Sequence, residues 1–263
     1  MSFETLSIRT DARGVATLTL DMAEKHNALA PQMIDELTAA AVQLATDTAV
    51  RVVVLTGAGE SFCAGGDLGW MREQFHADRA TRMAEARKLA MMLKALNELP
   101  KPVIGRIQGQ AFGGGIGMMS ICDTVVTVDS AKFGLTEVRL GLIPATISPY
   151  VLARMGEGKA RRVFMSARIF GASEAKDLNL IAKVVPADEL DGAIEAEIKP
   201  YLSAAPAAVA ASKALARSLG PVISDDVIDD TIRRLADTWE TPEAHEGISA
   251  FFDKRKPDWV AKR

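Results

Sequence analysis

Hydrophobic and polar residues follow two different periods along this chain, and each period predicts a type of secondary structure. Residues 6–9 and 15–20 alternate between apolar and polar on either side of a short polar turn, which is the pattern of a β-hairpin. From Pro31 to about Thr46 the apolar residues recur every three or four positions, which predicts an amphipathic helix that begins at the proline. The chain is therefore expected to open with a hairpin followed by a helix.

Further along, strand patterns and helical patterns alternate. Apolar runs predict strands at 51–55, 103–107 and 124–128. Between the first two strands, the spacing of apolar residues from Leu68 to Leu99 predicts mostly helix, which ends before Pro100. Strands that are separated by helices indicate an α/β architecture with crossover connections.

The pattern changes after Pro149, where helical spacing dominates. Helices are predicted at 151–166, 173–178, 188–202, 207–219, 224–240 and 242–252, with strand-like pieces at 168–170 and 183–185. We interpret residues 1–205 as an α/β core and residues 206–263 as a helical region. These last helices form no closed bundle, so we expect their apolar stripes to pack on the core or on another subunit.

Composition and charge narrow the classes of protein. The 263 residues are 48% hydrophobic, as in a globular protein, and a net charge of −3 without a long basic run argues against a nucleic-acid partner. Cys63 and Cys122 are the only cysteines and the histidines are scattered, so neither a disulfide framework nor a metal site is predicted. Without a signal segment or an apolar run of ~18 residues, we expect a cytoplasmic protein with no membrane contact.

Two glycine-rich segments, 61–67 and 112–115, each follow a predicted strand and precede a predicted helix. Glycine lets the backbone approach a ligand closely, and the first N–H groups of a helix are free to bind it. Two such N–H donors that converge on one oxygen would form an oxyanion hole. Neither segment has the spacing of a phosphate-binding P-loop or of a dinucleotide fingerprint. For either segment alone, a tight strand–helix turn is the alternative.

Glu137 is an acid in a strongly apolar stretch, 133–143. Burial among apolar side chains raises the pKa of a carboxyl group toward the range where it can both accept and return a proton. An acid in so apolar a setting is expected to have a functional role. The alternative is a buried acid that is held by a structural hydrogen bond.

Several blocks of sequence occur together in one order. They are HNAL at 26–29, FCAGGDL at 62–68, the glycines of 109–115 with CD at 122–123, FGLTE at 133–137, GLIP at 141–144 and AFFDKRK at 250–256. In these blocks the chain resembles the crotonase superfamily, the enoyl-CoA hydratase/isomerase family, over essentially its whole length. The resemblance implies an α/β spiral of ββα units with a C-terminal helical trimerisation region, and a homotrimer or homohexamer.

The resemblance also assigns roles to residues of this chain. The N–H groups of Gly66 and Gly114 would hold the thioester oxygen of an acyl-CoA, and Glu137 would move the proton. The implied substrate contacts are Lys25 and Ala28 near the pantetheine and phosphates, Ala64 and Leu68 near the adenine with Gly65 in the same loop, and Phe251 and Lys254 of a neighbouring subunit at the nucleotide end. No separate cofactor is implied, because coenzyme A is part of the substrate.

Gly117 departs from the family pattern, because two-acid hydratases carry a glutamate at this position. Three functions therefore remain open. The first is an enoyl-CoA hydratase that uses Glu137 alone, and the second is an enoyl-CoA isomerase with the same single acid. The third is a non-catalytic CoA-binding or RNA-associated member, which the intact Glu137 and the two intact loops disfavour.

The segment 134–150 resembles bacterial hydratases that act on methylglutaconyl-CoA in leucine degradation, or on longer isoprenoid glutaconyl-CoAs. Because Gly117 has no side chain, we expect open space beside the reacting carbon, which a methyl branch of such a substrate would fill. The carboxylate of the substrate could then help to hold the attacking water. The alternative is that a side chain from 71–75, or Tyr150, fills the space.

Overall fold

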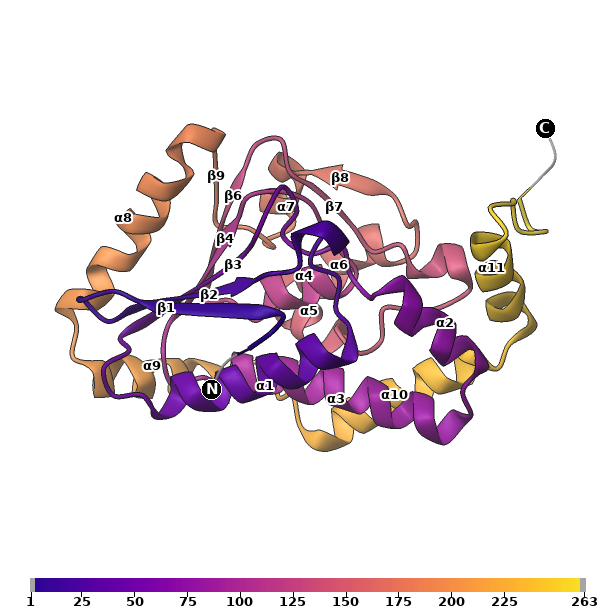
Figure 1. The fold of residues 1–263 in the computed structure, drawn as a ribbon, viewed down its shortest axis with the longest axis horizontal. Helices are drawn as coiled ribbons and strands as arrows, with labels where there is room; N and C mark the ends of the chain where they lie inside the picture. Colours follow the sequence, from indigo (N-terminus) through magenta and orange to yellow (C-terminus); the bar gives the residue numbers. More distant parts are fainter. Residues whose placement is uncertain (1–2, 261–263) are drawn as a thin grey trace.

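A computed structural model of the protein describes residues 3–260. Residues 1–2 of the predicted core and residues 261–263 of the predicted helical region lie outside the described residues. The larger sheet has six strands in the order β1-β2-β3-β4-β6-β9 (Figure 1). They are β1 (Leu6–Thr10), β2 (Val15–Leu20), β3 (Val52–Gly57), β4 (Val103–Ile107), β6 (Thr124–Val128) and β9 (Lys183–Val185). The first two strands form the predicted antiparallel hairpin, and every later neighbouring pair is parallel. The α/β architecture is therefore confirmed.

A smaller sheet of three strands was only partly predicted. Its strands are β5 (Ala111–Phe112), β7 (Lys132–Gly134) and β8 (Ile169–Gly171), in the order β5-β7-β8. Strands β5 and β7 contain two and three residues, which is too short for a period of two to show in the sequence. This small sheet positions two segments of the chain, because β5 leads into the triple glycine and β7 leads toward Glu137.

Helices cover the sheets and connect their strands. They are η1 (Ala23–Lys25), α1 (Pro31–Thr46), α2 (Leu68–His76), α3 (Arg79–Asn97), α4 (Gly114–Ser120), η2 (Glu137–Leu140), α5 (Ser148–Met155), α6 (Glu157–Phe164), α7 (Ala172–Asp177), η3 (Ala187–Glu189), α8 (Leu190–Ser203), α9 (Pro206–Leu219), α10 (Asp225–Trp239) and α11 (Pro242–Phe252). Helix α1 has the predicted bounds and buries the predicted apolar face.

Two predicted helices are each divided in the structure. The segment 68–99 breaks before α3, because the Asp78 side chain accepts the Thr81 N–H at 2.8 Å and so caps a new helix. The segment 151–166 breaks at Gly156, which has a φ of 74° and separates α5 from α6. The first break turns α2 away from α3, and residues of both helices line one cavity.

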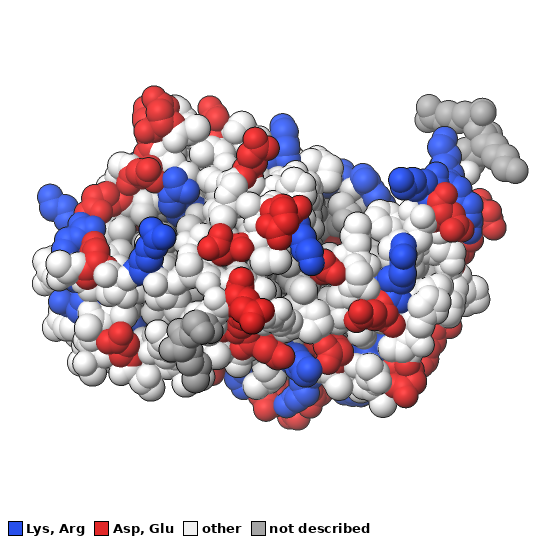
Figure 2. Space-filling model, in the orientation of Figure 1, with Lys and Arg blue, Asp and Glu red and all other residues white. Residues whose placement is uncertain are grey.

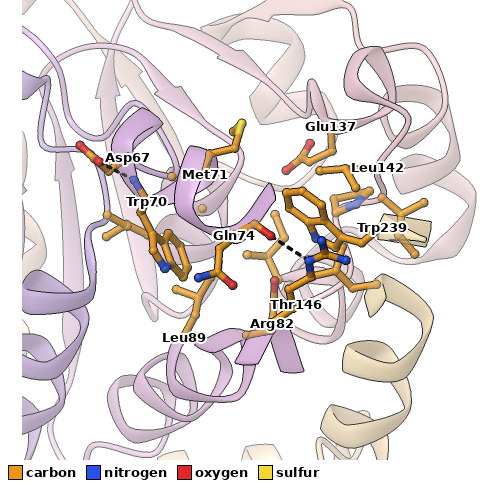
Figure 3. Close-up of a pocket in the computed structure, with 18 residues that line it drawn as sticks. Asp67, Trp70, Met71, Gln74, Arg82, Leu89, Glu137, Leu142, Thr146 and Trp239 are labelled. Carbon is orange, nitrogen blue, oxygen red and sulfur yellow. Dashed lines mark hydrogen bonds between the residues drawn. The ribbon is translucent and has the colours of Figure 1, made fainter. Parts of the chain in front are cut away.

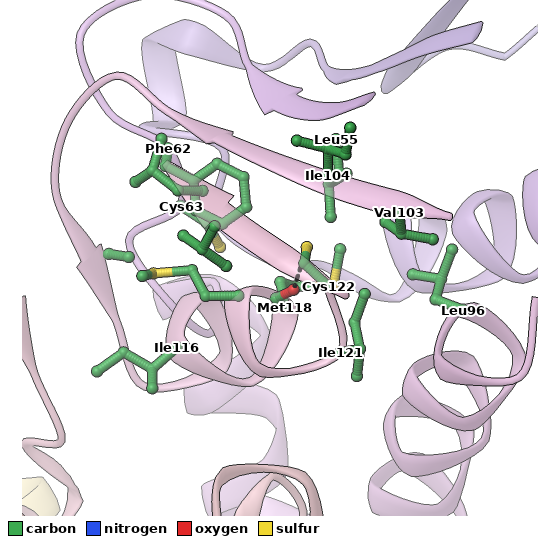
Figure 4. Packing of buried hydrophobic residues seen from close by; sticks show 14 of the residues in the cluster. Leu55, Phe62, Cys63, Leu96, Val103, Ile104, Ile116, Met118, Ile121 and Cys122 are labelled. Carbon is green, nitrogen blue, oxygen red and sulfur yellow. Dashed lines mark hydrogen bonds between the residues drawn. The ribbon is translucent and has the colours of Figure 1, made fainter. Parts of the chain in front are cut away.

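The main core lies around α4, which is buried along nearly its whole length (Figure 4). Cys122 follows this helix, and its thiol donates to the carbonyl oxygen of Met118 at 3.3 Å. Both Cys63 and Cys122 are fully buried, and burial raises the pKa of each thiol to about 12. The two cysteines are therefore protonated packing residues. The first turn of α4 packs closely against the first glycine-rich loop, since a Cβ atom on Gly115 would lie 2.5 Å from the carbonyl oxygen of Cys63.

The helices after Ala205 pack in different ways. Helix α10 lies along α3, with Ile228 and Ile232 against Ala86 and Ala90, and α11 packs against η2. Helix α9, in contrast, has no buried residue, and its Leu215 and Leu219 are exposed. Of the two expected partners for these helices, the core or another subunit, α10 and α11 therefore pack on the core of the same chain.

The surface carries both signs of charge. On the face in Figure 2, Lys and Arg side chains are interspersed with Asp and Glu, as expected from a net charge of −3. Within residues 3–260, no helix has the length and apolar character that a membrane crossing requires.

Candidate active site

The two glycine-rich loops are joined backbone to backbone. The first leads from β3 to α2, and the second leads from β5 to α4. Phe62 and Cys63 donate their N–H groups to the carbonyl oxygen of Gln110, at 3.1 and 3.2 Å. The Phe112 N–H donates in turn to the carbonyl oxygen of Cys63 at 3.1 Å. This short parallel pairing fixes the loops against each other, so the glycines that follow lie together.

The HNAL motif at 26–29 explains why the first loop keeps its shape. The Asn27 side chain is completely buried and donates to the carbonyl oxygens of Ala58 and Ser61, at 2.9 and 2.8 Å. Its Oδ1 accepts the Met22 N–H at 3.0 Å. The side chain of Asn27 therefore makes three hydrogen bonds, which connect this loop to the segment around Met22. The backbone of Asn27 has a φ of 54°, which asparagine adopts more readily than most residues.

Gly66 and Gly114 present free N–H groups to one cavity. Within residues 3–260 neither N–H donates a hydrogen bond to the protein, and both residues line the cavity. A Cβ atom built on Gly65 would lie 3.8 Å from the nitrogen of Gly114, so the two loops touch here. Unpaired N–H groups from neighbouring loops can bind one carbonyl oxygen, which is the arrangement of an oxyanion hole.

The carboxyl group of Glu137 faces the same cavity. Glu137 begins η2, and its Oε2 is buried without a hydrogen-bond partner in the described chain. Oε1 lies against Gly113, where an added Cβ would be 3.0 Å away; Gly113 also has a φ of 45°. Desolvation raises the pKa of Glu137 to about 7. The alternative of a structural hydrogen bond finds no support, because the buried oxygen has no partner.

The cavity has a volume of about 160 Å³ and is mostly apolar (Figure 3). Its lining residues are Leu29, Gly66, Asp67, Trp70, Met71, Gln74, Arg82, Ala86, Leu89, Gly114, Glu137, Leu142, Ile143, Pro144, Thr146, Ile147, Leu235 and Trp239. Trp70, Arg82 and Thr146 are polar lining residues that were not predicted from the sequence, and Gln74 was considered only as part of the segment 71–75. Trp70 and Gln74 are four positions apart on α2, and this spacing was the available signal. No cluster of metal-ligating side chains occurs within residues 3–260.

Lys25, Ala28, Ala64 and Leu68 gather beside the first loop. Lys25 ends η1, and its carbonyl oxygen accepts the Ala28 N–H at 3.1 Å. The carbonyl oxygen of the next residue, His26, accepts the Ala64 N–H at 2.9 Å. Leu68 starts α2 and is 53% exposed. The structure thus brings the predicted contact residues to one surface next to Gly66, outside the cavity lining.

Phe251 and Lys254 lie elsewhere. Phe251 is near the end of α11 and stacks edge-on against Phe252, whose ring is covered by the guanidinium of Arg72 from α2 at 4.7 Å. Helix α11 contacts η2 of the same chain, and none of its described residues lines the cavity. Within one chain these two residues are therefore separate from the cavity that Gly66, Gly114 and Glu137 line.

The prediction of open space at Gly117 is wrong. A Cβ atom on Gly117 would lie 2.5 Å from Cγ2 of Ile147 and 3.5 Å from Cδ1 of Leu93. Ile147 itself lines the cavity, whereas Gly117 is buried behind it. Neither expected alternative fills the space: Tyr150 donates to the carbonyl oxygen of Ala90 at 3.0 Å, and no residue of 71–75 is among the atoms nearest to that Cβ. Gly117 therefore makes room for an isoleucine and does not line the cavity.

The raised pKa of Glu137 predicts a characteristic pH profile. Below its pKa of about 7 the carboxyl group is protonated and cannot accept a proton, so kcat/KM should fall about tenfold for each pH unit. Above pH 7 the value of kcat/KM should become constant. Rates measured from about pH 5 to about pH 9, with circular dichroism at each pH to verify folding, would check this. A rate that stays constant down to pH 5 would contradict it.

Comparison with known proteins agrees with this geometry. The family model described as enoyl-CoA hydratase/isomerase matches residues 10–262. A 2,3-dehydroadipyl-CoA hydratase of Escherichia coli is 35% identical over 241 residues, which are 90% of each chain. An enoyl-CoA hydratase structure from Shewanella pealeana has 38% identity and a TM-score of 0.80, covering 98% of this chain and 96% of that one. One from Mycobacterium avium has 30% identity and a TM-score of 0.85, with 97% and 99% covered. The chain therefore belongs to the enoyl-CoA hydratase/isomerase family.

Proposed function

We propose that this protein is an enoyl-CoA hydratase, which adds water across the α,β double bond of an acyl-CoA thioester. One observation carries the proposal. A single apolar cavity contains the N–H groups of Gly66 and Gly114, which have no acceptor within residues 3–260, together with the carboxyl group of Glu137, whose Oε2 is buried without a hydrogen-bond partner there. Relatives that are named hydratases support it, at 30% identity or more over nearly the whole chain.

The proposed chemistry assigns one task to each group. The thioester oxygen accepts hydrogen bonds from Gly66 and Gly114, which stabilise the negative charge that develops on it. Glu137 as a carboxylate takes a proton from water while the water oxygen bonds to Cβ, and the π electrons move to form an enolate. Glu137 then returns that proton to Cα, and the thioester carbonyl is restored. A carboxyl group with a pKa near 7 can perform both transfers.

An enoyl-CoA isomerase is the second candidate, and one feature of the site favours it. The cavity is lined by two acids, Asp67 and Glu137, but Asp67 accepts the Trp70 N–H at 2.9 Å and caps α2. Only Glu137 is thus free to act, and one carboxylate suffices to move a proton between Cγ and Cα.

Mass spectrometry of the product separates the two candidates. Purified protein would be incubated with 2-enoyl-CoA and 3-enoyl-CoA thioesters of equal chain length. A hydratase converts the 2-enoyl substrate into a product that is heavier by one water. An isomerase converts the 3-enoyl substrate into the 2-enoyl compound without change of mass. If only the second reaction occurs, the hydratase proposal is wrong.

For the substrate we propose methylglutaconyl-CoA. The resemblance of segment 134–150 to hydratases of that compound supports this choice. The cavity supports it as well, because it is apolar around the reacting groups and has room for a short acyl chain. The CoA part would lie along Lys25, Ala28, Ala64 and Leu68, and Phe251 and Lys254 of a neighbouring subunit would contact its nucleotide end.

We also propose a homotrimer or a homohexamer, in which α9 contributes to the subunit contacts. Leu215, Leu219 and the following Val222 are 61%, 81% and 72% exposed, so this helix presents apolar surface that the chain itself leaves uncovered. Light scattering coupled to size exclusion should give three or six times the chain mass of 28.1 kDa. Leu219→Glu should shift the result toward lower mass, and the exposed Val42→Glu on α1 serves as the control. A wild-type monomer at micromolar concentration would rule the assembly out.

A further inference from the structure

Within residues 3–260 Arg82 makes no salt bridge, unlike two other arginines on the same helix, although its charge contributes to the lowered pKa of Asp78 before the helix. Arg79 pairs with Asp237 and Glu240 of α10, and Arg87 pairs with Asp225 and Asp229. Arg82 has no carboxylate within 4.0 Å in residues 3–260, and it is the only Lys or Arg among the described residues that line the cavity. The helix thus turns two arginines toward α10 and the third toward the cavity.

The guanidinium of Arg82 is held in a fixed orientation. Its Nε donates to the carbonyl oxygen of Gln74 at 2.8 Å, and Nη2 donates to that of Phe75 at 3.0 Å. Its central carbon lies 5.2 Å from the centre of the Trp239 ring, and Figure 3 shows the two side by side. Nη1 donates to no acceptor among residues 3–260. It is also not among the buried polar atoms that lack a partner, so this nitrogen is accessible. The carbonyl groups at the end of α2 and the ring of Trp239 therefore fix the guanidinium of Arg82, and its Nη1 remains free to donate to a ligand in the cavity.

A second donor without a partner lines the same cavity. Trp70 Nε1 is one of two buried side-chain polar atoms that have no hydrogen-bond partner in the described chain, and the other is Oε2 of Glu137. A buried donor without an acceptor is costly, so such a group indicates a ligand. The cavity therefore combines a catalytic carboxyl with two donors, Arg82 and Trp70, that the proposed catalytic steps do not use.

We propose that Arg82 determines specificity by binding a carboxylate at the end of the acyl chain remote from the thioester, with Trp70 Nε1 as an additional donor. The substrate class is then a 2-enoyl-CoA whose acyl group ends in a carboxylate. A guanidinium recognises carboxylate through charge-assisted hydrogen bonds, and these gain strength in an apolar cavity that excludes water. This inference rests on the proposed hydratase function and assigns to it a residue and a substrate class.

The test compares substrates that differ only in the terminal group. One pair is methylglutaconyl-CoA and 3-methylpent-2-enoyl-CoA, and the other is 2,3-dehydroadipyl-CoA and hex-2-enoyl-CoA. In each pair a methyl group replaces the carboxylate. The measured quantity is the ratio of kcat/KM for the carboxylated substrate to kcat/KM for the neutral one. Wild type, Arg82→Met, Arg82→Lys and the control Arg87→Met would be assayed side by side.

The ratio for wild type should exceed one in at least one pair. Arg82→Met should lower that ratio by about 30-fold or more, mainly through KM, because a charge pair inside a cavity is lost. Arg82→Lys keeps the positive charge but loses the paired donors of the guanidinium, so its ratio should lie between those of wild type and Arg82→Met. Arg87→Met should keep the wild-type ratio. If Arg82 only ties α2 to α3, Arg82→Met lowers both rates alike and the ratio stays constant, which overturns the inference. Absence of hydration of every substrate would instead refute the hydratase function itself.

Discussion

Glu137→Gln is expected to lower kcat for hydration by at least ~10²-fold, because glutamine keeps the shape of the side chain but cannot accept the proton of water. Binding of the thioester should change little, since the oxyanion donors and the cavity walls remain in place. The measurement is a steady-state assay together with the affinity for a non-reactive acyl-CoA.

Glu73→Gln is a suitable control for this substitution. Glu73 is an exposed acid on α2 and does not line the cavity, so the same chemical change there should leave kcat near wild type. The role of Glu137 would be refuted by wild-type turnover of the Gln variant in a folded protein. Equal loss of binding affinity and turnover would point to damage of the site as a whole.

Gly66→Pro is expected to lower kcat by ~10²–10³-fold, the usual effect of removing one oxyanion donor. Proline has no N–H, and the Gly66 N–H has no acceptor in residues 3–260, so the substitution breaks no hydrogen bond of the described chain. Proline restricts the preceding residue, and Gly65 has a φ of 94°. The thermal midpoint of the variant must therefore be compared with that of wild type.

Gly66→Ala separates the loss of the donor from the loss of glycine. A Cβ atom on Gly66 meets no atom within 4 Å, and alanine keeps the N–H. This control should retain activity within a few-fold. If Gly66→Ala is as inactive as Gly66→Pro, the loop needs glycine for its shape and the N–H is not the important group.

Segments with a regular period were predicted well, because the period reports a face that is buried. The hairpin 6–20 and the helix 31–46 are examples, since each buries one side along its whole length. The break between α2 and α3 was missed because apolar spacing continues through it, although Asp78 with Thr81 three residues later is a capping signal. Short strands such as β7 depend on partners far away in the chain and leave no local trace.

The candidate site shows the same division between local and distant information. Gly66, Gly114 and Glu137 were predicted from local motifs, and the structure brings all three to one cavity. The filling of the space at Gly117 by Ile147 could not be predicted, because the two residues are thirty positions apart and only their packing reveals the contact. Arg82 was missed for a similar reason, since helical spacing alone does not say which polar residue faces a cavity.

The buried carboxyl of Glu137 also couples the folding of the chain to proton binding. Its pKa is about 7 in the folded protein against 4.5 for the unperturbed group, so the native state holds this proton more tightly than the unfolded chain does. Its contribution to the free energy of unfolding is therefore largest at acidic pH and declines as pH rises from 4.5 through 7, by an amount on the order of a few kcal/mol. The ionised form, which the proposed hydration requires, is thus the form that the fold disfavours. Selection for thermal stability and selection for catalytic rate act on this one side chain in opposite directions.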